Sequence, residues 1–275
     1  MDSPAADEKF IDVENVIRKK NPKLLRAIPS FVTKYIKKIL HQDKINWAIH
    51  EFRNDYGKDF VHSVLNELGT NYESYGSENI PVTGRFIFAA NHPLGGLDGM
   101  VLIDDVGKHF ANLKFVVNDL LLNLKNLEPV FVPVNKHGRQ SVDYARRIEE
   151  TYSSDEQVLY FPAGLCSRKM RGTITDLEWH KSFIKKAVQY KRDIIPVYIE
   201  GRNSAFFYNL ANIRKVLGIK ANIEMLYLAD EMFKQSKKKI TLRYGKPIPY
   251  TLFDSSKRPA EWADEVRKIV YSLKA

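Results

Sequence analysis

One stretch of the 275-residue chain places a histidine and a carboxylate around a glycine-rich turn. In the segment RFIFAANHPLGGLDGM, an apolar run leads into Asn91 and His92, and Asp98 comes six residues after the histidine. Histidine has the ordinary pKa nearest neutrality, so it can take the proton of an alcohol while that oxygen attacks a carbonyl carbon. A carboxylate that accepts the other ring N–H fixes the tautomer and stabilises the imidazolium. These residue types predict a general base, His92, oriented by Asp98.

The glycines of this loop suggest where the opposite charge is stabilised. Gly95 and Gly96 allow unusual backbone angles and the close approach of a ligand. Their N–H groups, or those of the helix that begins near Asp98, are candidate donors to the oxyanion of an attacked carbonyl. The alternative is purely structural: His92 serves the turn, and Asp98 only caps the next helix.

The elements that must position this loop alternate between strands and helices. Apolar runs typical of strands occupy 86–90, 115–117, 130–134, 158–161, 194–199 and 240–244. Helical patterns occupy 100–110, 142–153, 181–191 and the end of the chain within 254–275. Several strands are almost continuously apolar, as strands covered on both faces must be. The pattern predicts an α/β fold, a mixed and mostly parallel sheet flanked by helices, whose strand ends carry the ligand site.

A basic N-terminal segment precedes the sheet. Residues 18–44 hold nine Lys and Arg and one acidic residue, in a chain of net charge +10. Apolar residues recur there at spacings of three and four, which predicts amphipathic helices divided at Pro29, and 46–72 also looks helical. We expect 1–79 to be a helical segment that docks on an anionic membrane surface and 80–275 to be the catalytic domain. A solvated basic face is the alternative.

Composition excludes several classes of protein. A single cysteine, Cys166, excludes an internal disulfide framework. No apolar run approaches the roughly 20 residues of a membrane span, and the acidic start is unlike a signal peptide. The remaining histidines lack metal-ligand spacing, so neither a metal nor a bound cofactor is expected. Zinc-finger and basic–aromatic RNA motifs are missing, so no nucleic acid is expected, and without G-x-S-x-G a serine hydrolase is disfavoured.

Five blocks, in order, resemble the glycerolipid (lysophosphatidic-acid-type) acyltransferase family. The loop from His92 to Asp98 resembles the family's H-x-x-x-x-D motif, and FPAGLCS at 161–167 resembles its F-P-E-G-x-x-S block. Shorter stretches resemble its later aromatic-basic, proline and G-x-P-I blocks: 179–183, 194–197 and 245–248. The match spans roughly 80–250. It implies transfer of a fatty acyl group from a thioester to a lipid hydroxyl, with His92 as base and Asp98 as its partner.

Departures from the family pattern concern the acceptor. Five residues separate the histidine from the aspartate where the family has four. Ala163 replaces the Glu of F-P-E-G, and Leu165 and Cys166 replace the Thr-Arg pair of a block in which the family grips its acceptor's phosphate. With GRNS at 201–204, these features resemble the aminolipid branch, which includes hemolysin-like proteins. Those enzymes acylate ornithine- or glycine-type lipids at the hydroxyl of an N-linked 3-hydroxy fatty acid, so their acceptor carries a carboxylate.

Candidate substrate-binding residues follow the strand ends. They are Asn118, Phe161, Pro162, Gly164, Arg168, Lys169 and Arg202. Arg168, Lys169 and Arg202, taken as surface cations, could hold an anionic headgroup. Asn118 with Asp119 lines the cleft or caps a short helix. Cys166 is either an inert packing residue or a rival thiolate nucleophile that would hold the acyl chain.

The sequence therefore predicts a peripheral O-acyltransferase on the inner face of the cytoplasmic membrane. Its donor would be an acyl thioester of acyl carrier protein or coenzyme A, and its acceptor a lysolipid of the glycine or ornithine type. Within the class, 1-acylglycerol-3-phosphate is the alternative acceptor. From another class, the alternative is a non-catalytic basic module that binds lipid or nucleic acid.

Overall fold

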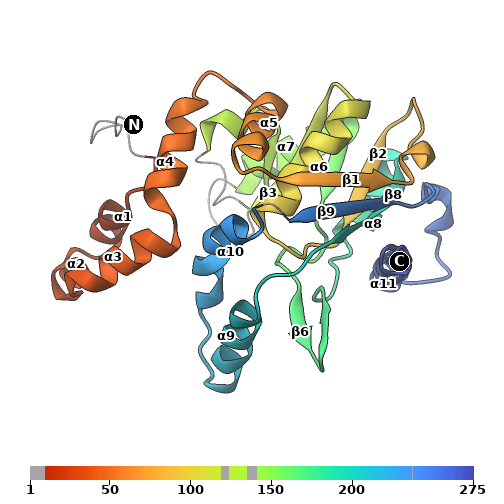
Figure 1. Cartoon of the computed structure of the whole chain (residues 1–275). Helices are drawn as coiled ribbons and strands as arrows, with labels where there is room; N and C mark the ends of the chain where they lie inside the picture. Colours follow the sequence, from red (N-terminus) through yellow and green to blue (C-terminus); the bar gives the residue numbers. More distant parts are fainter. Residues whose placement is uncertain (1–9, 119–123, 135–140, 237) are drawn as a thin grey trace.

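A seven-stranded sheet forms the centre of the molecule (Figure 1). The computed structural model describes residues 10–118, 124–134, 141–236 and 238–275. The strands, in the order β1-β9-β8-β2-β5-β3-β4, are β1 (Asn71–Tyr75), β9 (Lys239–Tyr244), β8 (Asp193–Glu200), β2 (Phe86–Ala90), β5 (Gln157–Tyr160), β3 (Leu113–Asn118) and β4 (Phe131–Val134). Only the β8–β9 pairing is antiparallel within this sheet. The predicted fold, a mixed and mostly parallel sheet, is confirmed.

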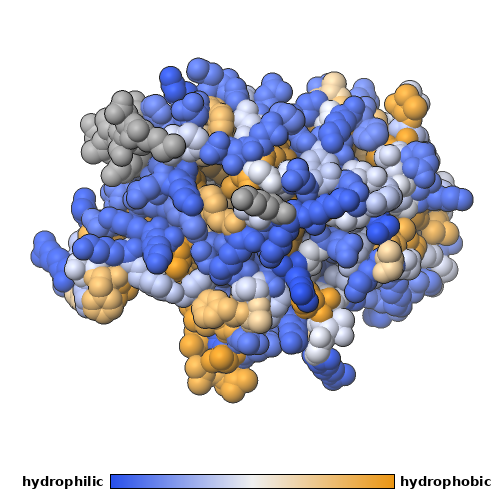
Figure 2. Space-filling model, in the orientation of Figure 1, coloured by the Kyte–Doolittle hydropathy of each residue, from blue (hydrophilic) through white to orange (hydrophobic). Residues whose placement is uncertain are grey.

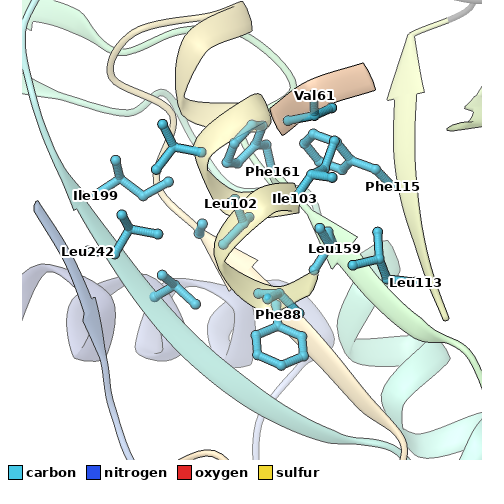
Figure 3. Close-up of a cluster of buried hydrophobic side chains, with 14 of the residues drawn as sticks. Val61, Phe88, Leu102, Ile103, Leu113, Phe115, Leu159, Phe161, Ile199 and Leu242 are labelled. Atoms are coloured by element: carbon cyan, nitrogen blue, oxygen red, sulfur yellow. The ribbon is translucent and has the colours of Figure 1, made fainter. Parts of the chain in front are cut away.

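Helices cover both faces of the sheet. On one face lie α5 (Lys58–Glu67) and α6 (Gly96–His109); on the other lie α7 (Ser141–Ser153), α8 (Ser182–Tyr190) and α11 (Pro259–Ser272). Successive residues of β2 point to opposite faces, so Phe88 joins the first core while Ile87 and Ala89 join the second. Figure 3 shows the first core, where Leu102 of α6 lies between Leu159 and Leu242 of the sheet. Burial on both faces explains the continuous apolar runs.

The N-terminal helices are α1 (Val13–Lys20), α2 (Pro22–Ala27), α3 (Ser30–Ile39) and α4 (Gln42–Glu51), and they extend to one side of the sheet (Figure 1). Pro29 separates α2 from α3, as predicted. The helix expected over 46–72 is interrupted instead, because Gly57 adopts a φ of 56° between α4 and α5. The expectation of a helical segment over 1–79 is wrong at 71–75, where β1 pairs in parallel with β9. Its polar sequence, NYESY, suits a partly exposed edge strand and contains no apolar run from which a strand could be predicted.

Several shorter elements lie beyond the sheet. A hairpin joins β6 (Arg168–Met170) to β7 (Thr173–Thr175), and α9 (Ala205–Val216), the 3-10 helix η5 (Ile223–Tyr227) and α10 (Leu228–Lys234) follow β8. Three further 3-10 turns are η2 (Ser77–Asn79), η4 (Lys125–Leu127) and η6 (Tyr250–Leu252). Among the described residues, no helix is long and apolar enough to cross a bilayer.

Candidate active site

The loop between β2 and α6 carries the predicted base at the carboxyl edge of the sheet. Asn91 anchors the end of β2 on β8: its Nδ2 donates to the carbonyl of Ile199 (2.9 Å), and its Oδ1 accepts the N–H of the same residue (2.6 Å). His92 follows directly. The apolar strand and its amide clamp thus fix the point from which the histidine ring leaves the sheet.

The structure brings His92 and Asp98 together. His92 Nδ1 lies 3.1 Å from both carboxylate oxygens of Asp98, which is fully buried. The carboxylate also accepts the N–H groups of Leu94 (2.7 Å) and Gly99 (2.9 Å), so backbone donors fix its position. The histidine side chain keeps 15% of its surface exposed, which leaves it within reach of a substrate. The five-residue interval therefore still closes into a histidine–carboxylate pair.

The surroundings of His92 favour its protonated form. Burial alone would lower its pKa, but the charge of Asp98, then the thiol of Cys166 and hydrogen bonds to both, raise the pKa of His92 well above its ordinary value. Cys166 Sγ lies 3.8 Å from Nε2, the nitrogen opposite Asp98. With Asp98 on one side of the His92 ring and Cys166 on the other, the thiol is placed as a thiolate nucleophile would be. The same arrangement also suits an inert thiol that only packs beside the ring.

A pH profile and one variant separate these two roles of Cys166. A base must be unprotonated, so we expect kcat/KM to rise with pH through a midpoint above the ordinary histidine pKa. Cys166→Ala removes one cause of the raised pKa, so the midpoint should move to lower pH. If a hydroxyl attacks directly, this variant should keep activity within about tenfold; a covalent route predicts a loss of about 10³-fold or more and an acylated thiol in the intact mass.

Phe161 orients the imidazole. Its ring stacks on that of His92, with centroids 4.1 Å apart and planes 20° apart, and its edge meets Phe115. Pro162 and Gly164 build the turn behind it: Gly164 N–H donates to the carbonyl of Phe161 (3.0 Å), and the carbonyl of Pro162 accepts the N–H of His180 (2.9 Å). All three were predicted to bind substrate; in the structure Phe161 packs on the ring of His92.

A second buried carboxylate, Asp176, holds the backbone of His92, and the sequence did not predict it. One of its oxygens accepts the N–H of His92 (3.2 Å) and the hydroxyl of Ser167 (2.5 Å), and the other accepts Trp179 Nε1 (2.9 Å). Ser167 N–H in turn donates to the carbonyl of His92 (2.7 Å). Burial raises the pKa of Asp176, while these hydrogen bonds lower it. The only local sequence feature that pointed to this role is the spacing of Asp176 three residues before Trp179, whose indole N–H it accepts.

The two loop glycines have different roles. Gly95 has a φ of 89°, and its N–H points to the Asp98 carboxylate (3.3 Å), so it does not face a substrate. Gly96 is exposed and begins α6, where its N–H has no acceptor within the helix. The oxyanion donor predicted at this turn is therefore better placed at Gly96 than at Gly95.

The matched variants Gly95→Ala and Gly96→Ala test this difference. A Cβ on Gly95 would force a side chain into a left-handed backbone and would lie 3.1 Å from Leu228 Cδ2 and 3.3 Å from Cys166 Sγ. We expect the free energy of unfolding of Gly95→Ala to fall by about 1–3 kcal/mol, and most of the activity to be lost with it. A Cβ on Gly96 meets nothing within 4 Å, so that variant should fold normally in urea titrations. Equal stability of the two variants would contradict this assignment.

The three predicted headgroup cations lie in unlike places. Arg168 is not a surface cation: it is buried and paired with the fully buried Glu224, Nη2 to Oε1 at 2.9 Å. Lys169 is exposed on the β6–β7 hairpin, and Arg202 is exposed on the loop after β8. Asn118 ends β3, paired in register with Val134 of β4; Asp119 lies outside the described residues.

The loop of Arg202 touches the loop of His92. Asn203 Nδ2 donates to the carbonyl of Pro93 (3.2 Å), and Gly201 packs so closely on Leu94 that a Cβ there would come within 2.8 Å of it. Arg202 is flanked by both contacts. Of the predicted cations, Arg202 is therefore the exposed one whose neighbours contact the loop of His92.

The fold and the site define a class of protein: an α/β protein with a histidine–aspartate pair at the carboxyl edge of its sheet. Within the described residues, no group of three His, Cys, Asp or Glu side chains is arranged to hold a metal ion. A family model described as Acyltransferase matches residues 15–275. The chain belongs to this acyltransferase family. The non-catalytic alternative is thereby set aside.

Two curated relatives extend over nearly the whole chain. A lyso-glycine lipid O-acyltransferase of Bacteroides thetaiotaomicron is 52% identical over 96% of this chain and 97% of its own length. One of the same name from Phocaeicola vulgatus is 48% identical over 96% and 95%. The crystal structure of the 1-acyl-sn-glycerophosphate (LPA) acyltransferase PlsC from Thermotoga maritima aligns at a TM-score of 0.49, with 20% identity and 89% coverage of each chain. Sequence similarity alone carries the family assignment.

Proposed function

We propose that this enzyme transfers a fatty acyl group from an acyl thioester to the hydroxyl of a lyso-glycine lipid. The observation that carries the proposal is the identity of about half of all residues, over nearly full length, with two proteins of that activity. The chain also has a buried Cys166 where the phosphate-gripping block of glycerolipid acyltransferases has arginine. Loss of that cation disfavours a phosphomonoester acceptor and fits one that carries a carboxylate.

The chemistry follows from the His92–Asp98 pair. His92 Nε2 removes the proton of the lysolipid hydroxyl as its oxygen attacks the thioester carbonyl, and Asp98 stabilises the imidazolium through Nδ1. The N–H groups at the start of α6, beginning with Gly96, face the charge that develops on the carbonyl oxygen. Collapse of the intermediate breaks the C–S bond, and His92 returns the proton to the departing thiolate. The products are an ester and a free thiol.

The donor is an acyl thioester of acyl carrier protein or coenzyme A, and the place of reaction is the inner membrane surface. Exposed Phe31 and Tyr35 on α3 alternate with exposed Lys34 and Lys38, while Lys37 is paired with Glu14 (2.6 Å). Aromatic and cationic side chains side by side suit the headgroup region of an anionic bilayer. The exposed side chains of α3 thus support the docking role proposed for residues 1–79.

Acceptor preference tests the proposal. We expect a higher kcat/KM with lyso-glycine lipid than with 1-acylglycerol-3-phosphate when each is supplied with the same acyl thioester. Arg202→Gln should raise KM for the glycine lipid by about tenfold, because it removes the cation for the carboxylate, and leave KM for the thioester unchanged. Lys246→Gln, at an exposed lysine of the closing block, serves as the control. A preference for the phosphate acceptor would refute the proposed substrate.

A further inference from the structure

An apolar projection stands out from the carboxyl edge of the sheet. It comprises residues 205–227, that is α9, the turn at Gly218 and η5, and we call it the α9 projection. Val216 is 86% exposed and Leu217 66% exposed. The other exposed apolar side chains of the projection are Phe206, Ile213, Ile219 and Leu226. They form the hydrophobic patch at the lower edge of the molecule, over α9 (Figures 1 and 2). A water-soluble surface seldom gathers so many apolar side chains without a partner.

The charges around this patch have one sign. Lys215 and Lys220 are exposed on the projection itself, and Lys169 and Arg171 are exposed at the tip of the adjoining β6–β7 hairpin. Asn212 Nδ2 links α9 to that hairpin through the carbonyl of Lys169 (3.4 Å). Neither 168–175 nor the exposed positions of 205–227 contain an acidic residue. The surface is therefore apolar with a cationic border.

The α9 projection is fixed to the active site. Glu224 of η5 is buried between Arg168, two residues after Cys166, and Arg214 of α9, with an N–O distance of 2.9 Å to each. Leu228, which directly follows η5, lies against Gly95. A body bound to the projection would therefore be held at a set position relative to His92.

The projection and α10, which follows it, are also joined to the N-terminal helices. The hydroxyls of Tyr35 on α3 and Tyr227 on η5 lie 2.9 Å apart, and His41 Nε2 lies 2.9 Å from Asp230 Oδ1 of α10. Figure 1 shows α9 and β6 at the lower edge of the molecule and α2 and α3 at its lower left. The N-terminal helices and the α9 projection are thus linked by side-chain hydrogen bonds.

We propose that the α9 projection is a second membrane-contact element, whose apolar side chains enter the interface of an anionic bilayer while the bordering cations meet its headgroups. The proposal rests on the proposed function in that a lipid acceptor lies in such a bilayer. A second copy of the chain fits less well as the occupant, because a two-fold contact would bring the cationic borders together. The bilayer supplies both the apolar interior and the negative charge that this surface matches.

The test uses the full-length protein and vesicles of phosphatidylglycerol and phosphatidylcholine. Val216→Asp with Leu217→Asp should weaken binding to these vesicles by about tenfold or more, since two apolar side chains no longer enter the interface. Val82→Asp is the control, because Val82 is 92% exposed but precedes β2, at the opposite edge of the sheet. Unchanged binding by the double variant, or an equal loss in the control, would overturn the proposal.

Two further readouts keep the test independent of folding and turnover. In Leu217→Trp, brominated phospholipids should quench the fluorescence of the added indole, whereas in Val82→Trp they should not; equal quenching, or none, would overturn the proposal. Vesicle binding needs no turnover, so the contact stands even if no acyl transfer occurs and the proposed function fails. Self-association of the wild type that the double variant abolishes, without a change in vesicle binding, would identify a second copy as the occupant.

Discussion

His92→Ala should lower kcat/KM for acyl transfer by about 10²–10⁴-fold without unfolding the protein. In the proposed mechanism the ring supplies the Nε2 that takes the hydroxyl proton, and alanine has no group that can do so. The thiol of Cys166 lies 3.8 Å from Nε2. Asp98 keeps its backbone donors Leu94 and Gly99 when the ring is removed, so its carboxylate is not left unpaired. Initial rates of two-chain product, with circular dichroism of the same samples, measure the effect.

The chain contains a matched control for this variant. His62 of α5 also pairs with an aspartate: its Nδ1 lies 3.0 Å from Oδ1 of Asp104. Its side chain, however, is 63% exposed, and it lies on a helix that covers the sheet rather than in the loop between β2 and α6. His62→Ala should keep wild-type activity. A histidine variant at 92 that retains activity would contradict the role assigned to it, and equal losses in both variants would point to damage to the fold.

Glu224→Gln should produce the largest loss of stability. Glu224 is fully buried between two arginines: Arg168, also buried, donates to Oε1, and Arg214 Nε makes an ionic contact with Oε2 whose geometry is not that of a hydrogen bond. Neutralising it leaves two positive charges in the interior with no compensating carboxylate. Removal of one partner of a buried ion pair costs about 3–5 kcal/mol, which we expect in the free energy of unfolding measured in urea.

An exposed carboxylate gives the comparison. Glu265 of α11 contacts Lys268 at 3.3 Å in the same kind of ion pair, but on the surface. Exposed pairs are screened by water and salt, so Glu265→Gln should leave the urea midpoint unchanged. Arg168 directly follows the FPAGLCS block at 161–167. The Glu224 variant should therefore also lose activity at urea concentrations below its unfolding midpoint. Equal midpoints in the two variants would show that the buried cluster contributes little.

The sheet could be predicted because its strands are buried on both faces. Continuous apolar runs at 86–90 and 194–199 correspond closely to β2 and β8. β1 could not be found this way, since an edge strand with one partner needs no apolar run. The start of α6 was expected four residues too late, because glycines at 95 and 96 read as a loop although Gly96 is already helical.

The contact between His92 and Asp98 could be predicted because it is local in sequence, whereas the residues that support it are distant. His92 and Asp98 lie six residues apart, and one loop brings them together. Asp176 reaches His92 across 84 residues of chain, and Glu224 reaches Arg168 across 56. Such partners follow from the packing of distant segments, which the spacing of residues does not encode. Arg168 was therefore expected at the surface, although folding pairs it with a buried acid.

The most direct test of the account follows one acyl group through the reaction. Purified protein is given an acyl thioester with an isotopically labelled chain and lyso-glycine lipid, and both the lipid product and the released thiol are measured by mass spectrometry and thiol titration. We expect one labelled ester, on the hydroxyl of the N-linked acyl chain, for each thiol released. Thiol release without the labelled ester, or no two-chain product at all, would contradict it.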